Sequence, residues 1–285
     1  MNRDELVLIP EKLAQKPPKT DLLNIINNKS FNDKVLFECD SNFHTIKVVE
    51  NEIGRFLHYK DTYQAGFINT EIYSGNLPYI NYFLIPYLMN NKIKSVLLIG
   101  LGSGKIVNDY EFLFNDLKTV DVIDLEENIV FIAEEFFNFK PSSNFNFILQ
   151  DGITYLRNNK KKYDLIVVDV ANNDGIDLRF LGEEYFENIK KSLKKSGIFV
   201  SNMCAGTDFG NKNNIFFKDF FPVYKRYFEQ NLVFKGNYSD KVYYKAFFDI
   251  NERVIDITNV IIISSDKHYK IKQNEELYNN ISKLN

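Results

Sequence analysis

The chain has 285 residues, 45% hydrophobic and 26% charged, which excludes a disordered protein and fits one large domain carrying a smaller addition. The 35 Lys and Arg residues nearly balance the 38 Asp and Glu residues, so the net charge of -3 argues against nucleic acid as the main partner. Two cysteines and three histidines, spread along the sequence, predict neither a disulfide framework nor a metal site.

The N-terminal residues do not resemble a secretory signal, because Asp4 and Glu5 interrupt the apolar run that a signal peptide needs. No stretch of 18 apolar residues occurs, so we expect a cytoplasmic protein without a membrane span. Between residues 34 and 72, the short runs VLFE, HTIKVVE, RFLHY and TYQAGFI alternate with turn-forming pairs. Residues 1–75 are therefore predicted to form an N-terminal extension and a small antiparallel β-domain.

A second domain is predicted over residues 76–285. It begins with LPYINYFLIPYLMNN, which reads as a helix with Pro78 in its first turn. Five apolar runs follow, with helical segments between them at residues 126–139 and 183–193, and they are KSVLLIG, TVDVID, NFNFILQ, YDLIVVDV and GIFVSN. Apolar strands alternating with helices predict a parallel sheet that is covered on both faces.

The C-terminal third is predicted to complete this sheet. A helix is expected around residues 213–230, followed by antiparallel strands near residues 241–248 and 259–264. The predicted fold class is thus α/β, a doubly wound, mostly parallel, seven-stranded Rossmann-like sheet with a small N-terminal β-domain.

In such a sheet the ligand lies beyond the carboxyl ends of the strands, and the first strand is followed by a glycine-rich turn. Here Gly100, Gly102 and Gly104 surround Ser103, so a ligand can approach the backbone and the free N–H groups of the next helix. We expect these four residues to bind a nucleoside co-substrate. A tight turn between strand and helix is the structural alternative.

The next two strands end in carboxylates. Asp124 follows the second strand about twenty residues later, where a carboxylate can accept hydrogen bonds from both hydroxyls of a ribose. Asp151 and Gly152 follow the third strand, where the carboxylate can accept from an adenine amino group. Helix capping is the alternative for both carboxylates.

Asp169 ends the fourth strand, DLIVVDVA, above the point where the other strand ends converge. A carboxylate after a fully apolar strand loses hydration, which favours a use for it at that position. As a catalytic group it would deprotonate or orient an attacking amine. The alternative is that it caps the next segment.

Together these segments resemble the polyamine aminopropyltransferase, or spermidine synthase, family, which shares the fold of class I S-adenosylmethionine-dependent methyltransferases. The resemblance covers roughly residues 37–265 and rests on VLLIGLGSG, VIDLEENIVFIAEEFF, QDGITYL and YDLIVVDV. Gln64 in DTYQAG matches a glutamine of the family's N-terminal β-domain that lies beside the donor, and His44 matches a polar position that reaches it. For His44 an exposed strand position is the alternative.

The resemblance implies transfer of an aminopropyl group from decarboxylated S-adenosylmethionine to a diamine such as putrescine, with release of methylthioadenosine. It implies no metal, no tightly bound cofactor and a homodimer, with Asp169 as the base. Aromatic faces suit cationic amines, so tyrosines near the site are candidate substrate contacts. We expect Tyr79 and Tyr238 there, and Tyr63 and Tyr82 as further candidates. Packing in the core is the alternative for Tyr63, Tyr79 and Tyr82, and a turn motif is the alternative for Tyr238.

This sequence departs from the family pattern at two positions. Ser103 replaces the loop aspartate that holds the donor's ammonium, and Lys105 follows it closely. After the fourth strand, Asn172 and Asp174 stand where the family carries a second aspartate, and we include both as candidate substrate contacts. Methyl transfer from intact S-adenosylmethionine, or a non-catalytic nucleoside-binding homologue, therefore remain alternatives.

Most phenylalanines are predicted to be core residues, because their helical spacing suits packing on the sheet. The clearest examples are Phe131, Phe136, Phe137, Phe186, Phe216 and Phe217.

Overall fold

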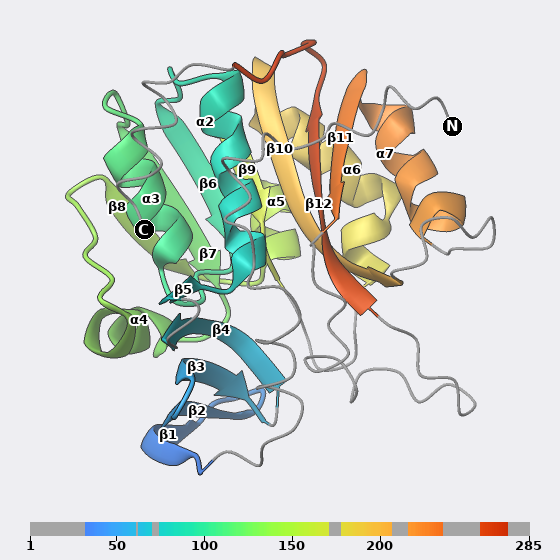
Figure 1. Ribbon diagram of the computed structural model, residues 1–285. Helices are drawn as coiled ribbons and strands as arrows, with labels where there is room; N and C mark the ends of the chain where they lie inside the picture. Colours follow the sequence, from blue (N-terminus) through green and yellow to red (C-terminus); the bar gives the residue numbers. More distant parts are fainter. Residues whose placement is uncertain are drawn as a thin grey trace.

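The computed structural model describes residues 32–60, 62–69, 74–170, 178–206, 216–235 and 257–272. These residues form two sheets, with the smaller one below the larger one in Figure 1. Within the described ranges no helix has both the length and the apolar character needed to span a bilayer.

The small sheet is antiparallel and has five strands in sequential order, as predicted for the N-terminal β-unit. Its strands are β1 (Lys34–Asp40), β2 (Thr45–Asn51), β3 (Gly54–Tyr59), β4 (Thr62–Asn69) and β5 (Ser74–Asn76). Inward-facing apolar residues such as Val48 and Leu57 are fully buried, while the edge strand β1 stays mostly exposed. Strand β5 spans the predicted domain boundary at residue 75, which remains a prediction.

The large sheet has seven strands in the order β11-β12-β10-β9-β6-β7-β8. The parallel strands are β6 (Ser95–Ile99), β7 (Thr119–Asp124), β8 (Phe145–Leu149), β9 (Tyr163–Val168) and β10 (Leu193–Gly206). Strand β12 (Ile257–Ser265) pairs antiparallel with β10, and β11 (Gln230–Lys235) with β12. The doubly wound α/β prediction is thus confirmed.

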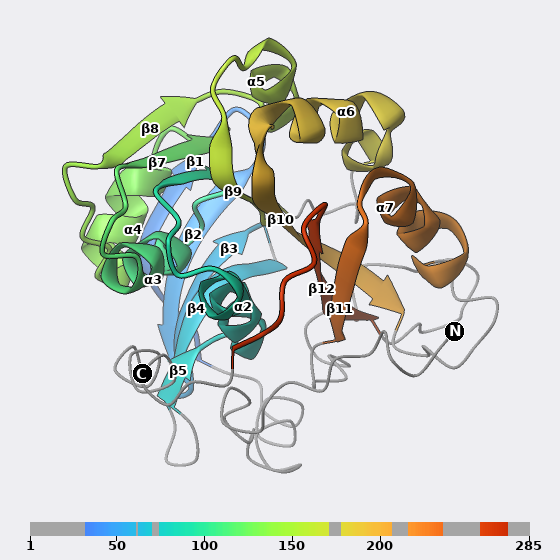
Figure 2. The same cartoon turned by 90° about the horizontal axis from the view of Figure 1, so that it is seen from above.

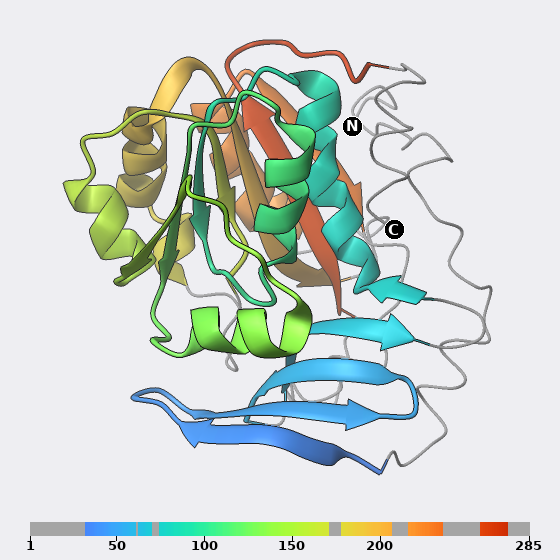
Figure 3. The same ribbon diagram turned by 90° about the vertical axis from the view of Figure 1, so that its left-hand side faces the viewer.

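Helices cover both faces of the large sheet (Figures 2 and 3). One face carries the 3-10 helix η2 (Pro78–Leu84), α2 (Ile85–Met89), α3 (Lys105–Leu113) and α4 (Ile129–Phe137). The other carries α5 (Gly152–Asn158), the 3-10 turn η3 (Leu178–Leu181), α6 (Glu183–Ser192), the π-turn η4 (Phe216–Phe220) and α7 (Phe221–Tyr227).

Some predicted elements differ from the structure. The first predicted helix is divided into η2 and α2, because Pro86 at the start of α2 has no N–H to continue the hydrogen-bond ladder. The helix expected up to residue 230 ends at Tyr227, and β11 was not predicted. The strand expected at residues 241–248 lies outside the described residues, whereas the one near 259–264 is confirmed as β12.

The phenylalanine prediction is right for Phe186, which is fully buried, and wrong for Phe131. Phe131 is 51% exposed, because it lies on the outer side of α4. Phe136 and Phe137 are partly buried against the core. The side chains of Phe216 and Phe217 are not among those that the structure describes.

The small sheet lies at the carboxyl ends of the parallel strands, the end to which the arrowhead of β10 points in Figure 1. A Cβ on Gly102, which follows β6, would stand 3.7 Å from Cβ of Ala65 in β4. Arg55 in β3 donates a 3.0 Å hydrogen bond to the carbonyl of Phe136 at the end of α4. The two sheets therefore enclose the strand ends where the sequence predicts the site.

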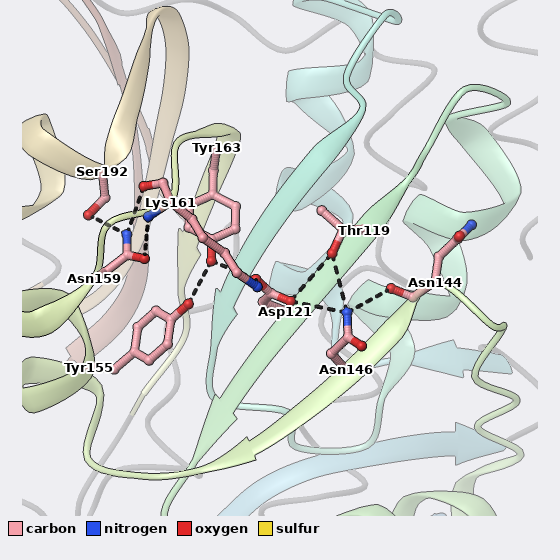
Figure 4. Close-up of polar contacts among 9 residues, drawn as sticks. All are labelled: Thr119, Asp121, Asn144, Asn146, Tyr155, Asn159, Lys161, Tyr163 and Ser192. Atoms are coloured by element: carbon pink, nitrogen blue, oxygen red, sulfur yellow. Dashed lines mark hydrogen bonds and ion pairs between the residues drawn. The ribbon is translucent and has the colours of Figure 1, made fainter.

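A buried polar cluster lies near the amino ends of β7 and β9 (Figure 4). Asp121 in β7 is fully buried, and its Oδ2 accepts hydrogen bonds from Lys161 Nζ at 2.7 Å and the Tyr163 hydroxyl at 2.6 Å. Asn146 donates to Oδ1 at 3.1 Å, and the Tyr155 and Tyr163 hydroxyls lie 2.6 Å apart. The Asp121 carboxylate thus accepts hydrogen bonds from several side chains. The cluster lies at the end of the sheet opposite the glycine-rich turn.

Candidate functional site

The glycine-rich turn is packed against the strand end that carries Asp169. The backbone N–H of Asp169 donates to the carbonyl of Ile99 at 3.0 Å, and Gly100 has φ of +93°. A Cβ on Gly100 would lie 2.2 Å from the Asp169 carbonyl oxygen, so no larger residue fits there. Gly104 is similarly restricted, because its φ is +76° and a Cβ would meet the Phe139 ring at 2.5 Å.

Asp124 lies beside the same turn, at the end of β7. Its Oδ2 accepts from the Leu101 backbone N–H at 2.8 Å, and its Oδ1 from that of Glu126 at 3.0 Å. Burial raises the pKa of Asp124, while these backbone donors favour the ionised form. The cap of α4 is Asn128, so Asp124 supports the turn instead and keeps lone pairs for further donors such as ribose hydroxyls.

Asp169 follows β9 and is held by two side chains from other elements. Asn202 Nδ2 in β10 donates to Oδ1 at 2.8 Å, and the Tyr79 hydroxyl in η2 donates to Oδ2 at 3.5 Å. Burial raises the pKa of Asp169 to about 6, against the opposing effect of these two hydrogen bonds. A carboxylate with such a pKa is ionised near neutral pH and basic enough to accept a proton.

Two of the site residues expected in the N-terminal β-domain, Gln64 and His44, each have a buried side-chain nitrogen without a partner among the described residues. They are Nε2 of Gln64 in β4 and Nε2 of His44, just before β2. The His44 ring lies 4.2 Å from that of Tyr59, and burial lowers the pKa of His44. Gln64 is next to Ala65, which faces the glycine-rich turn. The β3–β4 register shifts at Gln64, between the pairs His58–Tyr63 and Leu57–Ala65, so the usual alternation of side chains is broken there. An unpaired buried nitrogen at such a position is suited to a polar ligand.

Asp151 and Gly152 lie at the start of α5. Asp151 is the N-cap, because its Oδ1 accepts from both the backbone N–H and the hydroxyl of Thr154 at 2.9 Å. Gly152 packs tightly, since a Cβ would stand 2.5 Å from a methyl carbon of Ile99. The capping role is therefore observed, while contact with adenine remains a prediction.

The candidate substrate residues divide between the described and undescribed parts of the chain. Tyr79 contacts Asp169, whereas Tyr82 is a core residue, 8% exposed, with its ring 5.9 Å from that of Phe234. Asn172, Asp174 and Tyr238, together with the side chain of Tyr63, lie outside the described residues.

Ser103 and Lys105 bear on the choice of donor. Ser103 is buried in the turn. The Lys105 ammonium is paired with the buried carboxylate of Asp109 one helical turn later. Burial raises the pKa of Asp109 to about 6, although Lys105 opposes the shift. Where the chain is described, no cluster of three or more His, Cys, Asp or Glu side chains is arranged to hold a metal ion.

The sequence prediction missed Asn202, the shortest contact of Asp169. Its Oδ1 is buried and has no partner among the described residues, so it can accept an N–H from a bound amine. The run GIFVSN was recognised as a strand, and the rule applied to the other strand ends would have identified the asparagine at its end.

Replacing Asn202 with Ala should lower kcat about tenfold and move the acidic limb of the pH–rate profile to higher pH. The shift follows because Asn202 donates to the ionised carboxylate, so its loss raises the pKa of Asp169 further. Ser201→Ala is the control, since Ser201 accepts from the Tyr224 hydroxyl and faces the other side of the sheet. An unchanged pH profile for Asn202→Ala would contradict this role.

Comparisons with known proteins agree with the resemblance seen in the sequence. Residues 83–234 match the family model described as "Spermine/spermidine synthase domain". A polyamine aminopropyltransferase of Buchnera aphidicola subsp. Acyrthosiphon pisum is 25% identical over 211 residues, which cover 72% of this chain and 70% of that protein. One from Alkaliphilus oremlandii is 26% identical over 205 residues, covering 68% and 70%.

The fold also agrees with that of a solved spermidine synthase. The crystal structure of spermidine synthase from Thermotoga maritima superposes with a TM-score of 0.62 at 16% identity, covering 88% of this chain and 87% of that one. Because the family model covers more than half of the sequence, the chain belongs to the spermine/spermidine synthase domain family.

Proposed function

We propose that the protein transfers an aminopropyl group from decarboxylated S-adenosylmethionine to a primary amine of a diamine such as putrescine. The observation that carries this proposal is Asp169, a base with a pKa of about 6 held by Tyr79 and Asn202 beside the glycine-rich turn. The proposed binding residues for the donor are Gln64, Gly100, Gly102, Ser103, Gly104, Asp124, Asp151 and Gly152.

The reaction is a displacement at the carbon next to the sulfonium. The neutral amine nitrogen forms the new C–N bond as the C–S bond breaks, and the electron pair of that bond returns to sulfur, giving methylthioadenosine. The nitrogen releases one proton, which Asp169 accepts and passes to solvent. Holding both reactants between the two sheets supplies the orientation that such a displacement needs.

The pairing of Lys105 favours the decarboxylated donor over the intact one. Intact S-adenosylmethionine carries a carboxylate that a free lysine would attract, but the Lys105 ammonium is already neutralised by Asp109. Ser103 supplies a hydroxyl and no charge at the turn, so it can accept a hydrogen bond from the donor's ammonium but cannot neutralise its charge.

The test is to incubate purified protein with decarboxylated S-adenosylmethionine and a panel of diamines, and to measure methylthioadenosine. Formation of methylthioadenosine only when a diamine is present supports the proposal. No product with any diamine contradicts it, and S-adenosylhomocysteine formed from the intact donor would indicate methyl transfer instead. The homodimer also remains a proposal, which sedimentation of the same sample checks.

A further inference from the structure

An ion pair joins two segments that follow non-neighbouring strands of the large sheet. Arg179 in η3, the turn between β9 and α6, lies with Nη1 3.3 Å from Oδ2 of Asp151, which follows β8. Strands β6 and β7 lie between β9 and β8, and they end in the glycine-rich turn and in Asp124. The ion pair therefore links the two sides of the proposed nucleoside site.

Both partners are held by further contacts. Asp151 Oδ1 is occupied by the backbone N–H and hydroxyl of Thr154, which orient the carboxylate. The Phe180 ring, next to Arg179, packs at 5.3 Å against the ring of Tyr185 in α6. Since a carboxylate oxygen has two lone pairs, Oδ2 of Asp151 can accept a hydrogen bond from a ligand while it stays paired with Arg179.

We propose that Arg179 determines specificity for the purine of the donor, by fixing Asp151 to accept a hydrogen bond from the amino group of a 6-aminopurine nucleoside. This inference rests on the proposed function for the identity of the nucleoside. It extends that function by naming Arg179 as the residue that positions Asp151 for the amino group of the donor's purine.

Arg179 lies at the surface of the fold. Its side chain is 56% exposed, and an exposed ion pair contributes about 0–1 kcal/mol to stability. Arg179→Leu should therefore fold normally, so that a change in ligand binding can be measured directly. Comparing the thermal unfolding curves of Arg179→Leu and wild type checks that the variant keeps its fold.

Arg157 provides a matched control. It is 53% exposed and also binds a carboxylate, that of Glu184 in α6, through hydrogen bonds of 2.6 and 3.1 Å. It thus resembles Arg179 in charge, exposure and type of partner, but its carboxylate belongs to α6 and does not follow a strand of the large sheet.

The experiment measures binding of methylthioadenosine and methylthioinosine by calorimetry to the full chain, as wild type, Arg179→Leu and Arg157→Leu. Methylthioinosine has a carbonyl in place of the amino group, so it lacks the donor for Asp151. We expect Arg179→Leu to bind methylthioadenosine about tenfold more weakly and methylthioinosine unchanged, because a hydrogen bond to a charged group is worth 1.5–3 kcal/mol and only part is lost. Arg157→Leu should match wild type.

The kinetic counterpart is a higher KM for the donor with kcat unchanged, as expected for a contact far from the reacting carbon. Unchanged methylthioadenosine binding in Arg179→Leu overturns the inference, as does an equal loss for both nucleosides. If the wild type binds methylthioadenosine but forms no product, the proposed function fails while the inference stands on the binding data. A wild type that binds neither nucleoside overturns both.

Discussion

Replacing Asp169 with Asn should reduce kcat for aminopropyl transfer by about 10²–10⁴, the range that a general base contributes. Asparagine keeps the size of the side chain and can still bond to Asn202, but it cannot accept the proton that the attacking nitrogen releases. Methylthioadenosine should bind with nearly unchanged affinity, because the proposed nucleoside contacts lie elsewhere. Single-turnover product formation and calorimetry of the same preparation separate these effects.

The wild-type rate should depend on the same carboxyl group. Its pKa of about 6 predicts that kcat/KM rises as pH increases through 6, and that this limb is absent in Asp169→Asn. Because burial raises this pKa in the folded state, folding favours the protonated form, and stability falls as pH rises from the ordinary carboxyl pKa of about 4 to the folded value of about 6. Asp169→Asn should thus be no less stable than wild type at pH 8. Retained activity in this variant would overturn the role of Asp169.

Replacing Lys161 with Met should destabilise the fold by about 3 kcal/mol, the lower part of the range for removing one partner of a buried ion pair. The reason is that Asp121 is fully buried and would keep a negative charge without its cation (Figure 4). The lower value is expected because the Lys161 side chain is 61% exposed, so water can partly replace its ammonium. Urea denaturation at pH 7 measures the effect.

The neighbouring Lys162 is the matched control, because it is an exposed lysine on the same loop. Lys162→Met should change stability by less than about 0.5 kcal/mol. Adding Asp121→Asn to Lys161→Met should recover part of the lost stability, since it removes the unpaired charge. A double variant whose losses simply add would contradict the pairing.

The pH dependence of this cluster is opposite to that of Asp169. Burial alone would raise the pKa of Asp121, but hydrogen bonds from Lys161 and Tyr163 outweigh it and the pKa is lowered. Its stabilising contribution is therefore complete above the ordinary carboxyl pKa of about 4, and is lost as pH falls through the lower folded value. In Lys161→Met, acidification should therefore reduce the free energy of unfolding by less than it does in wild type.

The parallel strands and the small sheet could be predicted from the sequence because continuous and alternating apolar runs reflect burial on two faces or one. The rule that ligands lie beyond strand ends then selected Asp124 and Asp169, which the structure places on either side of the glycine-rich turn. Strand β11 was missed because QNLVFK is short and directly follows aromatic residues that suit a helix.

Contacts between distant segments were not predictable in the same way. The pair of Arg179 and Asp151 joins residues separated by two strands of the sheet, and no periodicity in the sequence records it. The pair of Lys105 and Asp109 differs, because its spacing of four residues in a helix is a recognised signal for an ion pair. This spacing predicts a paired Lys105, which is less able to attract the carboxylate of intact S-adenosylmethionine, and so it disfavours methyl transfer.

Strand β9 carries Tyr163 at one end and is followed by Asp169 at the other, about 20 Å away at the usual rise per residue. It is bonded to β6 on one side and β10 on the other, with its apolar side chains buried on both faces. Its backbone amides should therefore exchange with solvent only when the whole domain unfolds. The proposed base, Asp169, is thus attached to a strand that should open only with the whole domain, so its position should not depend on fluctuations of the surrounding loops.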